Sequence, residues 1–162
     1  MRIHVASDHA GLEFSRTLQR HLRDAGHDVV DHGPTEYEAL DDYPAFCIAA
    51  ARAVARDQQA GLDCLGVVVG GSGNGEQIAA NKVRGIRAAL VWNHDTAVLA
   101  RQHNDANVIS IGARQHSVDD ALVFVDAFLA EPFSEDVRPV RRIAELAEYE
   151  ASGAIAGHDV DR

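Results

Sequence analysis

The sequence predicts an α/β protein with a doubly wound, five-stranded parallel sheet, a Rossmann-like fold of three layers. Short apolar stretches alternate five times with helical patterns along the chain, as in parallel sheets with helices on both faces. Polar residues follow several of these stretches, where the carboxyl ends of parallel strands form a ligand-binding edge. The length of 162 residues, with 46% hydrophobic and 25% charged residues, suits one globular domain.

The five predicted strands are short apolar runs, each followed by polar or glycine residues. The first begins almost at the N-terminus, with no signal peptide before it. The second is weak, since it holds only two valines. The runs are Ile3–Ser7, Val29–Asp31, Leu65–Val69, Ile86–Trp92 and Val108–Ile111.

The predicted helices lie between and after these strands. The first places Phe14, Leu18 and Leu22 on one face and stops at Gly26, and Pro44 marks the first turn of the second. A further helix leaves a glycine-rich loop after the third strand. The second is expected to open at Asp41-Asp42-Tyr43-Pro44 and to run to about Arg56. The later helices are expected over Asp95–His103, over Ser117–Ala130 with Ser117 as its cap, and over Ser134–Glu150.

The last helix carries Ile143, Leu146 and Tyr149 on one stripe of an otherwise charged surface. It follows the five-stranded unit, so we expect it to reach a second subunit and to serve in dimerisation. We therefore expect a single domain over residues 1–150 and a disordered tail over 151–162.

Composition excludes several partners. The formal net charge of −10 opposes binding to nucleic acid or an anionic membrane. No apolar run approaches the roughly 18 residues of a membrane span, so the chain is expected to be cytoplasmic. Cys47 and Cys64 are isolated and predicted to be reduced core residues. The nine histidines show no metal-ligand spacing, so no metal is expected.

The run Gly70-Gly71-Ser72-Gly73-Asn74-Gly75-Glu76 is the most informative segment. Successive glycines let backbone N–H groups turn toward one point, which makes a nest for an anion. The nucleotide motifs fail: Glu76-Gln77 stands where a phosphate loop needs Lys and Ser/Thr, and neither the dinucleotide fingerprint nor the nucleophile elbow fits. A carboxylate beside N–H donors suits proton abstraction from carbon. Glu76 is therefore the candidate base, the alternative being a first-turn carboxylate that only favours the helix dipole.

Other polar residues have both a functional and a structural interpretation. Asp8 follows the first strand and is either a site residue or an N-cap. His103-Asn104 ends a helix and is either part of a site or a C-terminal cap. Arg138 and Arg142 lie four apart near a helix start, where they form either a fork for phosphate oxygens or a solvated face.

The chain resembles the type B ribose-5-phosphate isomerases, which are related to the galactose-6-phosphate isomerase subunits. The resemblance covers about residues 1–150 and rests on five motifs in order: Ser7-Asp8-His9-Ala10-Gly11, the glycine run with Ile78-Ala79-Ala80-Asn81-Lys82 behind it, Arg101-Gln102-His103-Asn104, Ile111-Gly112-Ala113-Arg114, and the closing arginines. It implies interconversion of ribose 5-phosphate and ribulose 5-phosphate through an enediolate, in the pentose phosphate pathway, by a homodimer without cofactor.

The resemblance also implies a role for each matching residue. Many members of the family use a cysteine at the start of the glycine loop as the base, but this chain has Gly70 or Gly71 at that position. It is therefore similar to the actinobacterial subgroup, in which the glutamate at the end of the loop is the base. That glutamate is Glu76 in this chain. His103 would open the sugar ring with help from Asp8. The residues implied in substrate binding are Asp8, His9, Gly71, Ser72, Gly73, Asn74, Gly75, Asn104 and Arg114, with Arg138 and Arg142 from the partner subunit. Pro139 stands where some relatives have a histidine.

Two other functions remain open at this stage. The substrate of an isomerase can be a six-carbon phosphate of the allose 6-phosphate type, because pocket depth is not visible in one sequence. A non-catalytic phosphosugar-sensing domain can share the fold. The presence of Ser72, Glu76 and His103 together favours an enzyme over a sensor, because a sensor needs only the anion nest and the arginines.

Overall fold

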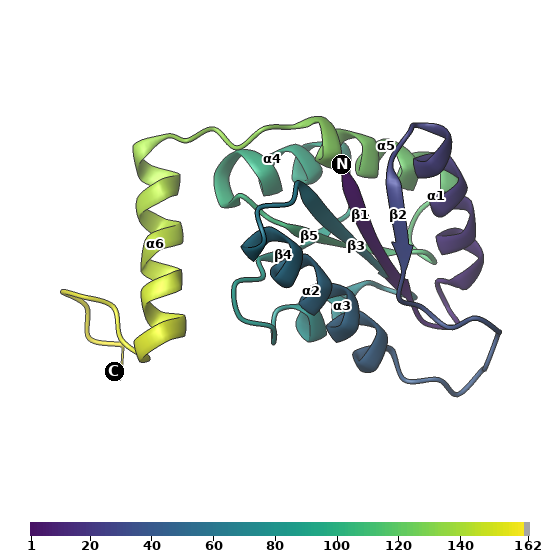
Figure 1. Cartoon of the computed structure of the whole chain (residues 1–162), viewed down its shortest axis with the longest axis horizontal. Helices are drawn as coiled ribbons and strands as arrows, with labels where there is room; N and C mark the ends of the chain where they lie inside the picture. Colours follow the sequence, from purple (N-terminus) through teal and green to yellow (C-terminus); the bar gives the residue numbers. More distant parts are fainter. Residues whose placement is uncertain (161–162) are drawn as a thin grey trace.

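The computed structural model describes residues 1–160 and has a five-stranded, all-parallel sheet (Figure 1). The strands are β1 (Arg2–Ser7), β2 (Asp28–Asp31), β3 (Cys64–Gly70), β4 (Ala88–Val91) and β5 (Val108–Gly112). Their order is β2-β1-β3-β5-β4. The predicted doubly wound sheet is thus confirmed.

Helices cover both faces of the sheet, which gives three layers (Figure 1). They are α1 (Leu12–Asp24), α2 (Tyr43–Gln59), α3 (Asn74–Ala80), α4 (His94–Asn104), α5 (Val118–Ala130) and α6 (Val137–Ser152). The α1, α4 and α5 helices pack on one face, and α2 and α3 pack on the other. Within residues 1–160 no helix is both long and apolar enough to cross a bilayer.

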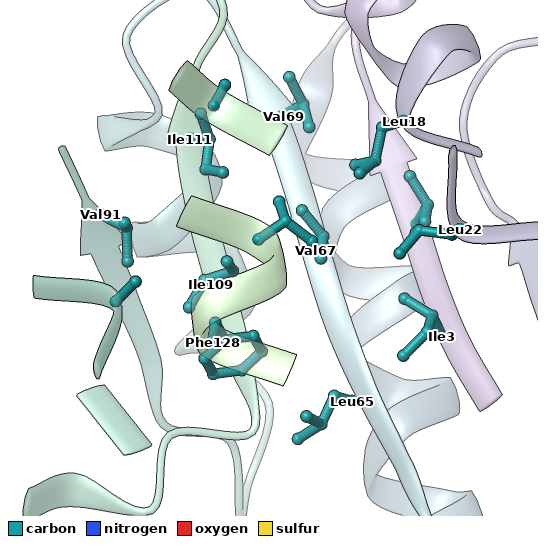
Figure 2. Close-up of a cluster of buried hydrophobic side chains, with 14 of the residues drawn as sticks. Ile3, Leu18, Leu22, Leu65, Val67, Val69, Val91, Ile109, Ile111 and Phe128 are labelled. Carbon is teal, nitrogen blue, oxygen red and sulfur yellow. The ribbon is translucent and has the colours of Figure 1, made fainter. Parts of the chain in front are cut away.

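Two apolar cores hold these layers together. The core under α1, α4 and α5 contains the fully buried Ile3, Ile109 and Phe128 (Figure 2). The core under α2 and α3 contains Val68 and, as predicted, the buried free cysteines Cys47 and Cys64. Successive strand residues point to opposite faces of the sheet, and both faces are covered by helices, so every position of β3 is buried.

The strand order reverses between β1 and β3, and this topology sets the place of the site. The chain leaves β1 toward β2 on one side, while β3 begins the other half of the sheet. The loops after β1 and β3 therefore meet in a crevice at the carboxyl edge. Gly11 permits this close approach, because a Cβ there would lie 2.7 Å from the Val69 carbonyl oxygen.

Several predicted boundaries are wrong at their ends. β4 is shorter than the predicted Ile86–Trp92, because the backbone at both ends bonds to side chains and not to a neighbouring strand. The Arg87 N–H donates to the Asn107 side chain, and the Trp92 N–H donates to Thr96 Oγ1. α2 continues three residues past Arg56 to Gln59. Asp8 is not the N-cap of α1, a position that Gly11 takes. Ser117 is the cap of α5, as predicted.

The α6 helix lies outside the sheet and its two covering layers (Figure 1), and it contacts them through Glu150, whose carboxylate accepts the Gly85 N–H at 2.9 Å. It begins at Val137 rather than Ser134, and Pro139 lies in its first turn. On its predicted apolar stripe, Leu146 remains 58% exposed and Tyr149 51% exposed. Such an unburied stripe is compatible with the predicted dimer contact, which stays a prediction.

The chain beyond α6 forms one antiparallel bridge, between Ile155 and His158. The predicted disordered tail over 151–162 overlaps the last turn of α6, which ends at Ser152. Its final residues, 161–162, lie outside the described residues.

Candidate active site

A cavity of about 550 Å³ opens at the carboxyl ends of β1 and β3. It brings together seven of the residues predicted from the sequence. These are Asp8, His9, Gly71, Ser72, Gly75, Glu76 and Arg114; Ala10, Tyr43 and Gln115 complete the lining. The crevice at the switch point of the strand order is thus a polar site with both acidic and basic side chains.

Glu76 lies in the first turn of α3 and is 4% exposed. Its carboxylate lies directly against Gly70: a Cβ at residue 70 would overlap the Oε1 and Cδ atoms of Glu76. Burial raises the pKa of Glu76, and the Asp8 carboxylate raises it further, while hydrogen bonds to the backbone of Glu76 and Gly73 oppose the shift. A buried carboxylate with a raised pKa is a stronger base than an exposed one.

The glycine loop is tied to the end of β5. The Ala113 N–H donates to the Gly70 carbonyl at 2.8 Å, and the Arg114 N–H donates to the Gly71 carbonyl at 3.2 Å. Gly73 adopts φ +80°, a left-handed conformation that glycine tolerates, and precedes α3 as its N-cap. The Arg114 side chain lies beside Gly71, where a Cβ would be 3.5 Å from its Nη1 atom, and it lines the cavity.

Ser72 and Asn74 contact each other within the glycine loop. The Ser72 hydroxyl oxygen accepts the Asn74 backbone N–H and its side-chain amide, each at 3.3 Å. Asn74 lines a neighbouring cavity of about 420 Å³ with Trp92 and His116, and Ser72 lines both cavities. Ser72 and Gln115 therefore line both cavities.

Asp8 and His9 form the wall contributed by β1. The Asp8 Oδ1 atom accepts the backbone N–H groups of Ala10 and Gly11, at 2.9 and 3.1 Å. This carboxylate therefore caps the turn before α1 and also lines the cavity. His9 Nδ1 lies 2.6 Å from the Oδ1 atom of Asp41, a residue of the loop between β2 and α2.

Asp8, His9 and Asp41 are also the group whose ligand atoms, within 4.8 Å of one another, could hold a metal ion. A ring nitrogen binds a metal through its lone pair. In the hydrogen bond of 2.6 Å to the Asp41 carboxylate, Nδ1 carries the proton and has no lone pair to offer a metal. The three residues fit a hydrogen-bonded cluster better than a metal centre.

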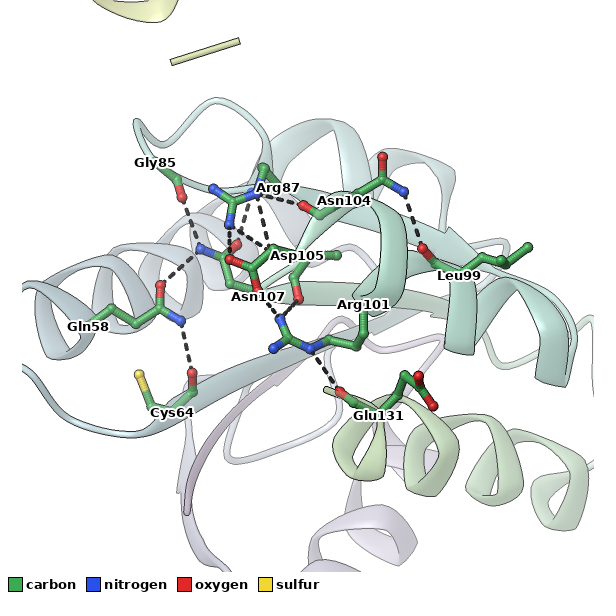
Figure 3. A network of polar contacts seen from close by, with 11 residues as sticks. Gln58, Cys64, Gly85, Arg87, Leu99, Arg101, Asn104, Asp105, Asn107 and Glu131 are labelled. Carbon is green, nitrogen blue, oxygen red and sulfur yellow. Dashed lines mark hydrogen bonds and ion pairs between the residues drawn. The ribbon is translucent and has the colours of Figure 1, made fainter. Parts of the chain in front are cut away.

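His103 and Asn104 lie at the other edge of the sheet. The α4 helix starts after the carboxyl end of β4 and runs back, so its last residues reach the amino edge. There the Asn104 carbonyl accepts a hydrogen bond from Arg87, the residue before β4 (Figure 3). The left-handed residue at the end of α4 is Asp105, with φ 41°, so the expected capping role of Asn104 is wrong. One chain therefore does not bring His103 to Glu76.

Arg138 and Arg142 both lie on α6, as the predicted fork requires. Both are exposed, and within residues 1–160 we find no hydrogen bond or ion pair for either. Between them, Arg141 forms an ion pair with Glu145, with its Nε atom 3.7 Å from Oε1. No residue of α6 is among those that line the cavity, so a chain does not bring its own Arg138 and Arg142 to that site.

Sequence reasoning missed Asp41 and Tyr43 as lining or supporting residues. Both come just before or within the start of α2, and the pattern Asp-Tyr-Pro was interpreted only as a helix beginning. In the structure Tyr43 faces Gly75, where a Cβ would lie 2.7 Å from the phenol oxygen. The available signal was that these polar residues follow the weak strand β2, whose carboxyl end lies at the same edge of the sheet as the site.

Comparisons with known proteins agree on one family. The family described as Ribose/Galactose Isomerase matches residues 3–146. The ribose-5-phosphate isomerase B of Mycolicibacterium paratuberculosis is 55% identical over 150 residues, 93% of this chain and 92% of that protein. The one of Mycobacterium tuberculosis is 53% identical, over 93% and 90%.

A solved structure supports the same assignment. Ribose-5-phosphate isomerase B from Mycoplasma genitalium, with bound ribulose-5-phosphate, superposes with a TM-score of 0.86 at 38% identity, over 93% of this chain and 97% of that one. The family match spans most of the chain, and the identities hold over nearly the full length of each relative. The chain belongs to the ribose/galactose isomerase family.

Proposed function

We propose that this protein interconverts ribose 5-phosphate and ribulose 5-phosphate with Glu76 as the base. The observation that carries the proposal is the buried Glu76 carboxylate, held against Gly70 in a cavity that also contains Asp8, His9 and Arg114. Relatives more than half identical in sequence carry the name of this activity. The bound ribulose-5-phosphate of the Mycoplasma genitalium structure is the ketose of the same pair.

The reaction moves one proton between neighbouring carbons. In the open-chain aldose, the Glu76 carboxylate takes the proton from C2, and the electron pair of that C–H bond forms the C1–C2 double bond of an enediolate. The negative charge moves to the C1 oxygen, where the Ser72 hydroxyl and loop N–H groups are the nearest donors. Glu76 then returns the proton to C1 while the O2 proton passes to O1, which leaves the ketose.

The raised pKa of Glu76 suits both halves of this cycle. A carboxylate of ordinary pKa is a weak base toward a C–H bond beside a carbonyl, and the burial of Glu76 makes it a better one. The space that this carboxylate fills is the space that a side chain at residue 70 would need. We infer that Gly70 and Glu76 act as a pair, which supports membership of the glutamate-base subgroup.

The remaining site residues come from a second copy in this proposal. His103 and Asn104 lie at the amino edge of the sheet in their own chain, and Arg138 and Arg142 lie on α6, which does not line the cavity. All four can act on one sugar only if another subunit brings them to the cavity. In the resulting homodimer His103 opens the sugar ring with Asp8 at the anomeric hydroxyl, and the two arginines bind the phosphate.

An isomerisation assay with a panel of five- and six-carbon aldose phosphates tests the proposal. We expect the highest kcat/KM with ribose 5-phosphate and an unchanged rate after addition of a chelator. Preference for a six-carbon phosphate would make the protein an isomerase of the allose 6-phosphate type. Binding without turnover of any sugar phosphate would make it a sensor, and a chelator-sensitive rate restored by metal would contradict the assigned chemistry.

A further inference from the structure

The loop between β2 and α2 keeps one carboxylate buried beside the cavity. The Asp41 side chain is 8% exposed, although the loop around it, residues 32–42, has no helix or strand. Removing a carboxylate from water costs free energy unless strong hydrogen bonds replace the water. The hydrogen bonds that Asp41 makes therefore indicate its role in the site.

Both side-chain hydrogen bonds that we find for Asp41 within residues 1–160 go to His9. The Oδ1 atom accepts the His9 backbone N–H at 3.1 Å and faces the ring Nδ1 at 2.6 Å. The other oxygen, Oδ2, is buried and has no hydrogen-bond partner among the described residues. Asp8 also approaches the same ring nitrogen, but at 4.0 Å. Asp41 therefore fixes both the backbone and the ring of His9.

This contact decides which ring nitrogen faces a ligand. An ionised carboxylate only accepts hydrogen bonds, so the proton of the short contact belongs to His9 Nδ1. The Nε2 atom is then the free position of a ring that is 24% exposed and lines the cavity with Arg114. Tyr37, from the same loop as Asp41, packs edge-on against the ring with centroids 6.1 Å apart. The ring is held on two sides and open on one.

We infer that Asp41 is a positioning residue of this site: it holds the His9 ring with Nδ1 protonated and Nε2 presented, as a hydrogen-bond acceptor, to a hydroxyl group of the sugar phosphate. The inference rests on the isomerase function proposed above. Asp41 is not among the residues that line the cavity and acts through His9, so its loss weakens substrate binding more than it slows the proton transfer at Glu76.

Steady-state kinetics with ribose 5-phosphate test this role in Asp41→Asn. We expect KM to rise about tenfold or more, from the loss of one charge-assisted hydrogen bond, with kcat reduced by less than about threefold. Glu38→Gln is the matched control, because it removes the same charge from an exposed position of the same loop and should leave both constants unchanged. Circular dichroism establishes that each variant is folded.

A double-mutant cycle separates positioning from a merely structural role. If Asp41 acts through His9, Asp41→Asn has less than about a twofold effect on KM in a His9→Gln background. Nitrogen-15 spectra of labelled histidine rings, with His9 assigned by the His9→Gln variant, should show the Nδ1-protonated form in the wild type and its loss in Asp41→Asn. These spectra need no activity and apply to the wild type even where a variant does not fold.

Two results would overturn the inference: a folded Asp41→Asn protein with the wild-type KM, or a wild-type His9 ring protonated at Nε2 alone. Failure of the proposed function looks different. A wild-type protein that isomerises no sugar phosphate contradicts the proposed function, and the ring spectra then decide the Asp41–His9 assignment by themselves.

Discussion

A methyl group at residue 70 tests the proposed base, Glu76, without substituting Glu76 itself. In Gly70→Ala, the new Cβ would overlap the Oε1 and Cδ atoms of Glu76, and it would lie 2.7 Å from Oε2. Gly70 ends a buried strand and has no positive φ, so alanine fits its backbone. The carboxylate is the group that has to move, out of the position from which it would reach a sugar's C2.

The expected magnitude is that of losing a general base. Such a loss costs about 10²–10⁴ in rate, or about 3–5 kcal/mol of transition-state stabilisation. We expect Gly70→Ala to lower kcat for ribose 5-phosphate into this range, measured by a coupled isomerisation assay. Crowding in a packed site also costs about 1–3 kcal/mol of folding free energy, so thermal unfolding is measured in parallel.

The control places the same methyl group where no carboxylate can be displaced. In a Glu76→Ala background, Gly70→Ala should lower the residual kcat by less than about threefold, because the two substitutions remove the same function. Wild-type turnover of the single variant, or an equal loss in both backgrounds, would refute the proposed pairing of Gly70 with Glu76.

Three further predictions concern stability and assembly. Burial lowers the pKa values of His4 and His32 from 6.5, and hydrogen bonds, chiefly from Arg2, lower that of Asp57 to about 2. At these three side chains the unfolded chain therefore binds protons at a higher pH than the folded chain. The free energy of unfolding, measured with urea, should fall as the pH drops below 6.5, through the histidines, and again below 3.8, through Asp57. A free energy of unfolding that does not change over this pH range would contradict the prediction. Because burial raises the pKa of Glu76, its ionised form destabilises the folded state at neutral pH. Glu76→Gln should therefore raise the temperature of thermal unfolding, by about 2–4 °C for each kcal/mol gained in the free energy of unfolding. Mixing inactive Glu76→Ala and Arg138→Ala subunits should restore some activity, because one of the two sites in a mixed dimer is intact; none recovered means that the arginine serves its own chain.

Much of the fold follows from local patterns. The buried run of β3 and the glycines after it predict a strand, a loop and a helix in the right order, and parallel pairing then places Asp8 and Glu76 at one edge. The ends of β4 were less predictable. Side chains of Asn107 and Thr96, distant or downstream in the sequence, take the backbone N–H groups that would have extended that strand.

The site was predictable only where its residues follow strands directly. His103 ends a helix that runs away from the ligand edge, so its place relative to Glu76 depends on assembly, which a single chain does not encode locally. Asp41 lies 32 residues from His9 in an irregular loop, and no spacing rule connects them. Such contacts arise from tertiary packing, and only coordinates reveal them.

The most direct test of the account is the turnover of Glu76→Gln with ribose 5-phosphate. Glutamine keeps the size and the buried position of the side chain but accepts no proton from carbon at neutral pH. The account predicts that kcat falls by about 10²–10⁴ in a protein that remains folded. A Glu76→Gln protein that isomerises ribose 5-phosphate at the wild-type rate would contradict it.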